Sequence, residues 1–190
     1  MALLSVAKRK EYFKALGFGE YNKDSILKFQ KKYFIRKKDM DGLYGNDTDI
    51  LLRHVWNVSK TKNFSPKEFI CDCGGKYCTG YPTYMKSYQL ANLQAIRNHW
   101  NRPMTITSGL RCRTRNARVG GIKNSLHLFG EATDFYMVGV TDTLAHRKSA
   151  IKWIKKLKRH HYTYGNGCSS VKGKNPYAPY MGNALHTDSQ

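Results

Sequence analysis

Three side chains in the second half of the chain limit most strongly what it can fold into. His127 and Asp134 lie seven residues apart in the segment 125–134, with Gly130 between them. This spacing fits a turn that leads into a strand, so that both side chains converge across the bend. His186 lies far along the chain and must come from a distant strand. The fold therefore has to bring remote segments together around one point.

Two imidazoles and one carboxylate are a ligand set that can hold a zinc ion and leave one coordination position for water. We therefore expect one catalytic Zn²⁺ on His127, Asp134 and His186. The same ligand types also serve iron in the facial triad of non-haem oxygenases. Those enzymes typically place the first histidine and the carboxylate two residues apart, on a barrel of many alternating strands. Neither feature is present in this sequence, which favours zinc.

The composition favours packed domains over disorder, because 41% of the 190 residues are hydrophobic. This length suits one large domain or two small ones. The sequence contains no apolar run of the length that spans a membrane. The opening residues place their few apolar side chains before the charges, which is the reverse of a secretory signal. We therefore expect synthesis in the cytoplasm without a signal peptide, and action after release.

The formal net charge of +20 favours an anionic partner. Nucleic acid, an anionic membrane face and an anionic cell wall are the candidates, and charge alone does not choose among them. A basic surface also keeps a protein soluble without any specific partner. The sequence lacks a recognisable nucleic-acid module with interleaved aromatic residues.

Apolar periodicity predicts an α+β fold in two domains. We expect a small all-helical domain over residues 1–60, with a polar linker at 60–63. A domain over residues 61–190 follows, in which a small antiparallel sheet is packed by helices. The pattern predicts three helices in the first domain, the second of them capped by Asp24, and a capping box at Ser65. In the second domain it predicts helices over 85–100 and 141–160 and strands over 103–108 and 132–138.

The first domain resembles the three-helix peptidoglycan-binding domains. The resemblance is carried by Phe29-Gln30 in the second helix and by the Asp41-Gly42, Gly45 and Thr48 pattern after it. Taken one by one, these residues have structural explanations, since the glycines suit tight turns and Phe29 and Leu43 suit a core. The assembled pattern implies that the ligand is wall glycan.

The second domain resembles the zinc D-alanyl-D-alanine carboxypeptidase-like peptidases, which include VanY-type enzymes and phage endolysin peptidases. The resemblance is carried by four segments, namely Phe64 to Phe69, Ser108-Gly109-Leu110-Arg111, Ser125-x-His127-x-x-Gly130-x-Ala132-x-Asp134, and Leu185-His186-Thr187-Asp188. It implies a fold of the hedgehog and D-Ala-D-Ala peptidase type. It also implies zinc ligation by His127, Asp134 and His186.

The same resemblance implies that Arg111 steadies a substrate carboxylate or a developing oxyanion, as its fixed donors allow. We also expect Ser125 to contact substrate. The loop over residues 166–182 is rich in glycine, proline and tyrosine and leads directly to His186. Loops of this length in compact domains are often functional, and Tyr180 is our candidate within it for binding substrate.

The general base departs from the family pattern. In much of the family an acidic residue stands about three positions before the last ligand, and here that position is Asn183. Among the remaining carboxylates of the second domain, Asp188 is our candidate, because strand spacing places it on the same side as His186. A domain that binds zinc without activity is the alternative.

Four cysteines form a second candidate site. Cys71, Cys73 and Cys78 are close in sequence, and Cys112 follows Arg111 directly. Four thiols suffice for a structural zinc, although this spacing is not a standard one. Disulfides and free buried thiols are the alternatives, and the odd total leaves one thiol unpaired in any disulfide scheme.

Together these features predict an endolysin-like peptidoglycan hydrolase that cleaves an amide bond of the wall stem peptide with zinc-activated water. A D,D-carboxypeptidase that trims terminal D-alanine is the first alternative. A non-catalytic basic protein that binds wall or nucleic acid is the second. We expect bacterial peptidoglycan and anionic wall polymers as partners, neither nucleic acid nor membrane, and a monomer.

Overall fold

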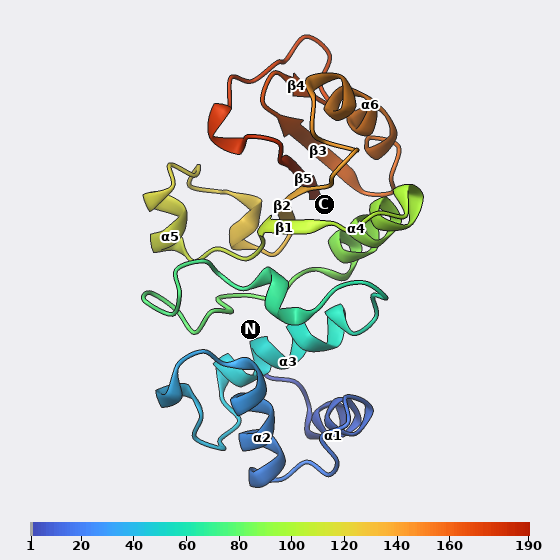
Figure 1. Cartoon of the computed structure of the whole chain (residues 1–190). Coiled ribbons are helices and arrows are strands. Elements are labelled where there is room, and N and C mark those ends of the chain that lie inside the picture. The colour runs from blue at the N-terminus through green and yellow to red at the C-terminus, as the bar shows by residue number, and fades with distance from the viewer. Residues whose placement is uncertain (1) are drawn as a thin grey trace.

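The N-terminal segment folds into three helices, and side-chain caps set the starts of the first two. The computed structural model describes residues 2–190. Helix α1 spans Val6–Ala15, α2 spans Lys23–Tyr33 and α3 spans Asn46–Val58 (Figure 1). Asn22, and not the predicted Asp24, caps α2, because its side chain accepts the Ser25 N–H while the Ser25 hydroxyl accepts the Asn22 N–H. This reciprocal pair satisfies two otherwise free donors at the helix start.

The buried side chain of Gln30 joins α2 to the turn that follows it. Its Nε2 donates to Asp41 Oδ1, to the Leu43 carbonyl and to Thr48 Oγ1, at 2.9 to 3.0 Å. Its Oε1 accepts the N–H of Gly42 at 2.7 Å. The glutamine, aspartate-glycine and threonine of the sequence pattern therefore form one hydrogen-bonded unit. Leu43, expected in the core, is instead 62% exposed, because its backbone and not its side chain belongs to this unit.

Helix α3 also packs on the second half of the chain. His54 is fully buried, its Nε2 lies 2.9 Å from the Pro66 carbonyl and its Nδ1 accepts the N–H of Met85 at 3.3 Å. Asn57 donates to the carbonyl of Met85 as well. The predicted linker lies against α4, where Gln94 Oε1 accepts the backbone N–H groups of residues 62 and 63. The division at residue 60 stays a prediction, but the two segments share a buried contact.

The second half contains one five-stranded sheet in the order β1-β2-β5-β3-β4, with every neighbouring pair antiparallel. The strands are β1 (Thr105–Ser108), β2 (Ala132–Tyr136), β3 (His160–Gly165), β4 (Cys168–Ser169) and β5 (Leu185–Ser189). Within residues 2–190, six α-helices accompany this sheet. The predicted α+β class is therefore confirmed.

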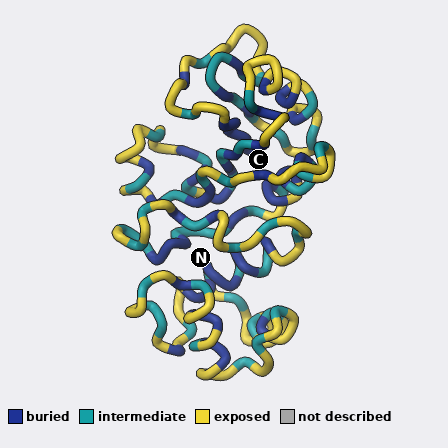
Figure 2. The backbone as a smooth tube through the Cα atoms, viewed as in Figure 1, coloured by how far each residue is buried: buried dark blue, intermediate teal, exposed yellow. Residues whose placement is uncertain are grey.

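Helices cover the sheet and leave its central strand buried (Figures 1 and 2). They are α4 (Ser87–Trp100) and α6 (Leu144–Ile154), while α5 (Arg113–Arg118) lies to one side of the sheet. The short 3₁₀ turns of the chain are η1 (Lys37–Asp39), η2 (Pro66–Phe69), η3 (Leu126–Leu128) and η4 (Pro179–Met181). All five residues of β5 are buried. Gln89 of α4 donates to the carbonyl of Thr187, and Asn92 donates to Ser189 Oγ, so α4 holds β5 in place.

The helix predicted over residues 141–160 is too long at both ends. Thr143 caps α6, and the helix ends at Ile154. Arg159 then adopts a left-handed φ of 59°, which reverses the chain into β3. The alternating aromatic and β-branched residues of β3 favour a strand over a helix there. Within the described part of the chain, no helix combines the length and the apolar character needed to cross a bilayer.

Candidate metal centre and active-site cleft

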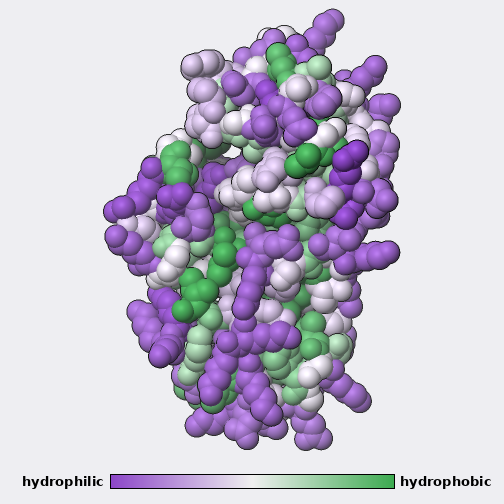
Figure 3. All heavy atoms as spheres, viewed as in Figure 1, coloured by the Kyte–Doolittle hydropathy of each residue, from purple (hydrophilic) through white to green (hydrophobic). Residues whose placement is uncertain are grey.

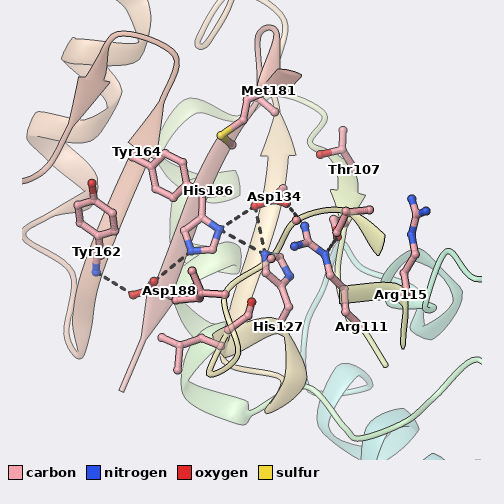
Figure 4. A pocket seen from close by; sticks show the side chains of 18 of the residues that line it. Thr107, Arg111, Arg115, His127, Asp134, Tyr162, Tyr164, Met181, His186 and Asp188 are labelled. Carbon is pink, nitrogen blue, oxygen red and sulfur yellow. Dashed lines mark hydrogen bonds and ion pairs between the residues drawn. The ribbon is translucent and has the colours of Figure 1, made fainter. Parts of the chain in front are cut away.

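Three side chains from separate elements meet at the centre of the sheet (Figure 4). His127 Nε2 lies 3.3 Å from both Asp134 Oδ1 and His186 Nδ1, and those two atoms lie 2.8 Å apart. Four ligands at about 2.0 to 2.1 Å from a zinc ion in tetrahedral geometry lie about 3.3 Å from one another. The three donor atoms therefore have the chemistry and the spacing of one divalent cation site.

The antiparallel register of the sheet places two of these ligands. Asp134 on β2 is directly opposite His186 on β5, and Tyr164 on β3 is opposite His186 from the other side. Directly opposite residues on one face have neighbouring side chains, so the pairing brings the carboxylate and the imidazole together. The Tyr164 ring lies against the His186 ring, with centroids 4.8 Å apart.

His127 comes from η3, which is positioned by a glycine. Gly130 has a φ of 72°, and a Cβ there would lie 2.1 Å from the carbonyl oxygen of Tyr84. Any other residue at this position would push the turn away from Tyr84 and Met85, which lie just before α4. His127 Nδ1 donates to the carbonyl of Gly109 at 2.7 Å, which leaves its Nε2 unprotonated and directed at the other two ligands.

Arg111 binds the far oxygen of the ligand carboxylate. Its guanidinium donates to Asp134 Oδ2 at 2.5 Å and, through Nε, to Ser108 Oγ at 2.8 Å. Asp134 Oδ1 thus faces the histidines while Oδ2 faces the arginine. A guanidinium carries five N–H donors, so others remain free for an anionic group in the cleft.

Asp188 lies behind His186 and contacts none of the other ligands. Its Oδ2 accepts from His186 Nε2 at 3.0 Å, while its Oδ1 accepts from His161 Nδ1 and from the Tyr162 N–H, both at 2.8 Å. Three donors thus converge on one buried carboxylate. A carboxylate on the outer nitrogen of a metal-binding histidine fixes its tautomer and orientation.

The pKa values of the cluster follow from burial and from these hydrogen bonds. Burial would lower the pKa of His186, but its bonds to Asp134 and Asp188 raise it to about 9. For His127 burial prevails and the pKa is lowered. For Asp134 and Asp188 burial acts to raise the pKa, yet the neighbouring imidazoles outweigh it and both carboxyl pKa values are lowered. Both carboxylates therefore stay ionised at neutral pH.

A cleft of about 750 Å³ opens over this cluster. All seven site residues expected from the sequence line it, namely Arg111, Ser125, His127, Asp134, Tyr180, His186 and Asp188. Ser125 is buried at the start of η3, and Tyr180 is 81% exposed at the edge of the cleft on η4. Glu131, a further carboxylate of the ligand loop, accepts a bond from Tyr88 and does not line the cleft.

His161 is a cleft residue that the sequence analysis did not single out. Its side chain is 53% exposed, and it lines the cleft while donating to Asp188. The register of β3 against β5 shifts between His160 and Tyr162, so His161 lies at an irregularity in the strand. The sequence signal for it is the run of histidine and tyrosine over residues 160–164, which begins where the predicted helix ends.

Comparison with known proteins agrees with this geometry. Residues 62–168 match the model of the Peptidase M15 family, and this range includes His127 and Asp134. A zinc D-Ala-D-Ala carboxypeptidase from Streptomyces albus G is 30% identical over 123 residues, which cover 62% of this chain and 47% of the relative. The chain thus spans about half the length of the curated relative that it matches. The family match covers more than half of the chain, which therefore belongs to the Peptidase M15 family.

Proposed function

We propose that the chain is a zinc peptidase that hydrolyses an amide bond in the stem peptide of bacterial peptidoglycan. The observation that carries the proposal is the set of three ligand atoms, 2.8 to 3.3 Å apart, at the base of an open cleft beside Arg111. The name of the Streptomyces relative, a zinc D-Ala-D-Ala carboxypeptidase, supports both the metal and the substrate class.

His127, Asp134 and His186 would hold the ion. A bound Zn²⁺ supplies Lewis acidity toward the scissile carbonyl and toward the attacking water. Arg111, already fixed by Asp134 and Ser108, directs its free N–H groups toward negative charge that develops on the substrate. Because these donors are held in place before substrate arrives, little reorganisation is needed during the reaction.

For proton transfer, the geometry favours a residue other than Asp188, which is the general base expected from the sequence. Asp188 has both oxygens occupied by donors and a lowered pKa, which makes it a poor base. We assign it instead to positioning His186 and His161. His161 is exposed to the cleft and bonded to Asp188, so its imidazole is our candidate to carry the proton.

The helical segment over residues 1–60 would hold the enzyme on the wall. Its Gln30 unit matches the sequence pattern shared with peptidoglycan-binding domains. Hydrophilic side chains cover much of the face seen in Figure 3, in keeping with the net charge of +20. Such a surface would favour anionic wall polymers, with a contribution that salt weakens.

Arg111 also favours a second candidate, a D,D-carboxypeptidase, because a guanidinium in the cleft suits the terminal carboxylate of a stem peptide. Mass spectrometry of digested sacculi separates the two activities. An endopeptidase, as expected of an endolysin, creates new amino groups within cross-links or stems. A carboxypeptidase releases free D-alanine and leaves the cross-links intact. Sacculi that remain unchanged by the zinc-loaded enzyme would contradict both.

A further inference from the structure

Four of the five cysteines gather at one point outside the cluster of His127, Asp134 and His186. Cys71, Cys73 and Cys78 come from the segment between η2 and α4, and Cys112 is the N-cap residue of α5. Their Sγ atoms all lie within 4.8 Å of one another. Cys71 and Cys112 are buried, and the other two are half-buried.

The distances suit a tetrahedral thiolate site. Four Zn–S bonds of about 2.3 Å in a tetrahedron separate the sulfur atoms by about 3.8 Å. The Sγ atoms of Cys73 and Cys78 lie 3.4 Å apart, and the remaining pairs fall within the 4.8 Å limit. One ion at the centre of this group would reach all four sulfurs with small side-chain rotations.

Backbone N–H groups point at three of the four sulfurs. The N–H groups of Gly80, Cys112 and Arg115 donate to the Sγ atoms of Cys78, Cys71 and Cys112, each at 3.4 Å. A hydrogen bond from an N–H group to sulfur is stronger when the sulfur is a negatively charged thiolate than when it is a neutral thiol. The three donors therefore favour the thiolate form of these cysteines. A cluster of neutral thiols would gain less from the same donors.

The segment that carries three of these cysteines lacks regular structure. Between η2 and α4, residues 70–86 form neither helix nor strand. Gly74, Gly75 and Gly80 adopt positive φ values of 61° to 97°, which adds to the entropy lost on ordering the segment. A long irregular segment in a compact domain needs an additional constraint, and a bound metal is one that small domains use.

We propose that Cys71, Cys73, Cys78 and Cys112 bind one structural zinc ion, separate from the ion on His127, Asp134 and His186. A disulfide would pair two sulfurs at a time, whereas the four sulfurs here approach one another as a single group. The inference does not rest on the proposed peptidase activity, since it follows from the thiol cluster alone.

This ion would also fix one wall of the active-site cleft. Cys112 follows Arg111 directly, so a bond to its sulfur restrains the backbone that presents the guanidinium. Asp72, within the cysteine segment, accepts two bonds from Arg115 of α5, at 2.6 and 2.8 Å. Asp72, Arg111 and Arg115 all line the cleft. The zinc would therefore join the irregular segment over residues 70–86 to the backbone that carries Arg111 and Arg115.

Cobalt substitution tests the proposal directly in the full chain. Co²⁺ bound to thiolates gives an intense sulfur-to-metal charge-transfer band in the near ultraviolet, and a site of two histidines and one aspartate has no sulfur to produce it. We expect this band in the wild-type protein and two equivalents of metal per chain under reducing conditions. The band and one equivalent should persist in His127→Ala, which removes a ligand of the other site only.

Two further variants localise the second ion. Cys73→Ser should lose one equivalent of metal and weaken or abolish the band. Cys168→Ser is the matched control, because Cys168 is buried in β4 and is not part of the cluster, and it should keep both equivalents. A wild-type protein with one equivalent and no charge-transfer band would overturn the proposal. So would mass spectrometry that finds these cysteines joined as disulfides in the native protein.

Discussion

His186 and Asp188 lie two residues apart on β5 and are joined by a hydrogen bond of 3.0 Å between Nε2 and Oδ2. The other ring nitrogen of His186 faces Asp134 and the candidate metal position. The bond therefore sets the tautomer in which Nδ1 is free to bind an ion. This relationship gives Asp188 a role distinct from that of a base in contact with substrate.

Replacing Asp188 by asparagine should weaken metal binding about 10- to 100-fold, because removal of such a supporting carboxylate typically has an effect of that size. Competition with a chromogenic chelator measures the change. Asp142→Asn, at a carboxylate that accepts from the Gly139 N–H, is the control and should bind metal normally. Loss of activity with unchanged metal affinity would instead support Asp188 as the base.

His161→Gln should lower kcat by about 100-fold or more while the metal content stays the same, because general acid–base groups contribute on that scale. The shape of the pH–rate profile should also change, because the group that carries the proton is lost. His160→Gln is the matched control, since the ring of His160 is hydrogen-bonded to the hydroxyl of Thr163. An unchanged pH profile in His161→Gln would remove His161 from proton transfer.

Arg111→Lys should lower kcat/KM by about 100-fold. Lysine keeps the charge but cannot reach Asp134 Oδ2 and Ser108 Oγ together and still offer donors to substrate. Arg113→Lys, at an exposed position of α5, should behave as wild type. Steady-state kinetics on a soluble stem-peptide substrate would decide, and equal activity of the two variants would contradict the assignment.

The free energy of unfolding should decrease in mild acid because His54 is buried. Burial lowers its pKa from 6.5 to about 4, although the bond to Pro66 opposes this shift. Below a pH of about 6.5 the unfolded chain binds a proton that the folded chain excludes until about pH 4. Stability is therefore full above this window and decreases within it, by about 3 kcal/mol in total.

The contribution of His54 can be isolated by subtraction. His54→Gln keeps a neutral side chain with both a donor and an acceptor, so it should lose the pH-dependent part of the stability. Urea denaturation at several pH values between 4 and 7 would give the difference between the two proteins. Parallel curves for wild type and His54→Gln would show that the folded and unfolded chains bind the proton at the same pH, which would contradict the lowered pKa of His54.

The sequence predicted the candidate metal cluster well because its spacing directly reflects geometry. His127 and Asp134 flank a turn whose glycine admits no side chain, and strand alternation alone places His186 and Asp188 on one face. The cluster of four thiols was also visible as a group. What spacing could not supply was the register that sets Asp134 opposite His186.

The role of His161, the exposure of Leu43 and the end of α6 were not predicted, because each depends on contacts between segments that are distant in the sequence. His161 acquires its partner through a register shift in β3 and through Asp188, 27 residues away, and no local pattern encodes either. Leu43 looked like core because it is apolar, but the Gln30 unit uses its backbone carbonyl. The helix expected to reach residue 160 ends at Ile154, and the chain turns through the left-handed φ of Arg159 before His160 pairs with Ser189 of β5.

The most direct test of the central claim is digestion of purified sacculi by the metal-depleted protein before and after zinc is restored, with the released products identified by mass spectrometry. We predict that zinc restores cleavage of stem-peptide amide bonds in the wild-type protein, whereas His127→Ala stays inactive. Intact sacculi after full zinc loading, or equal cleavage by His127→Ala, would contradict the account.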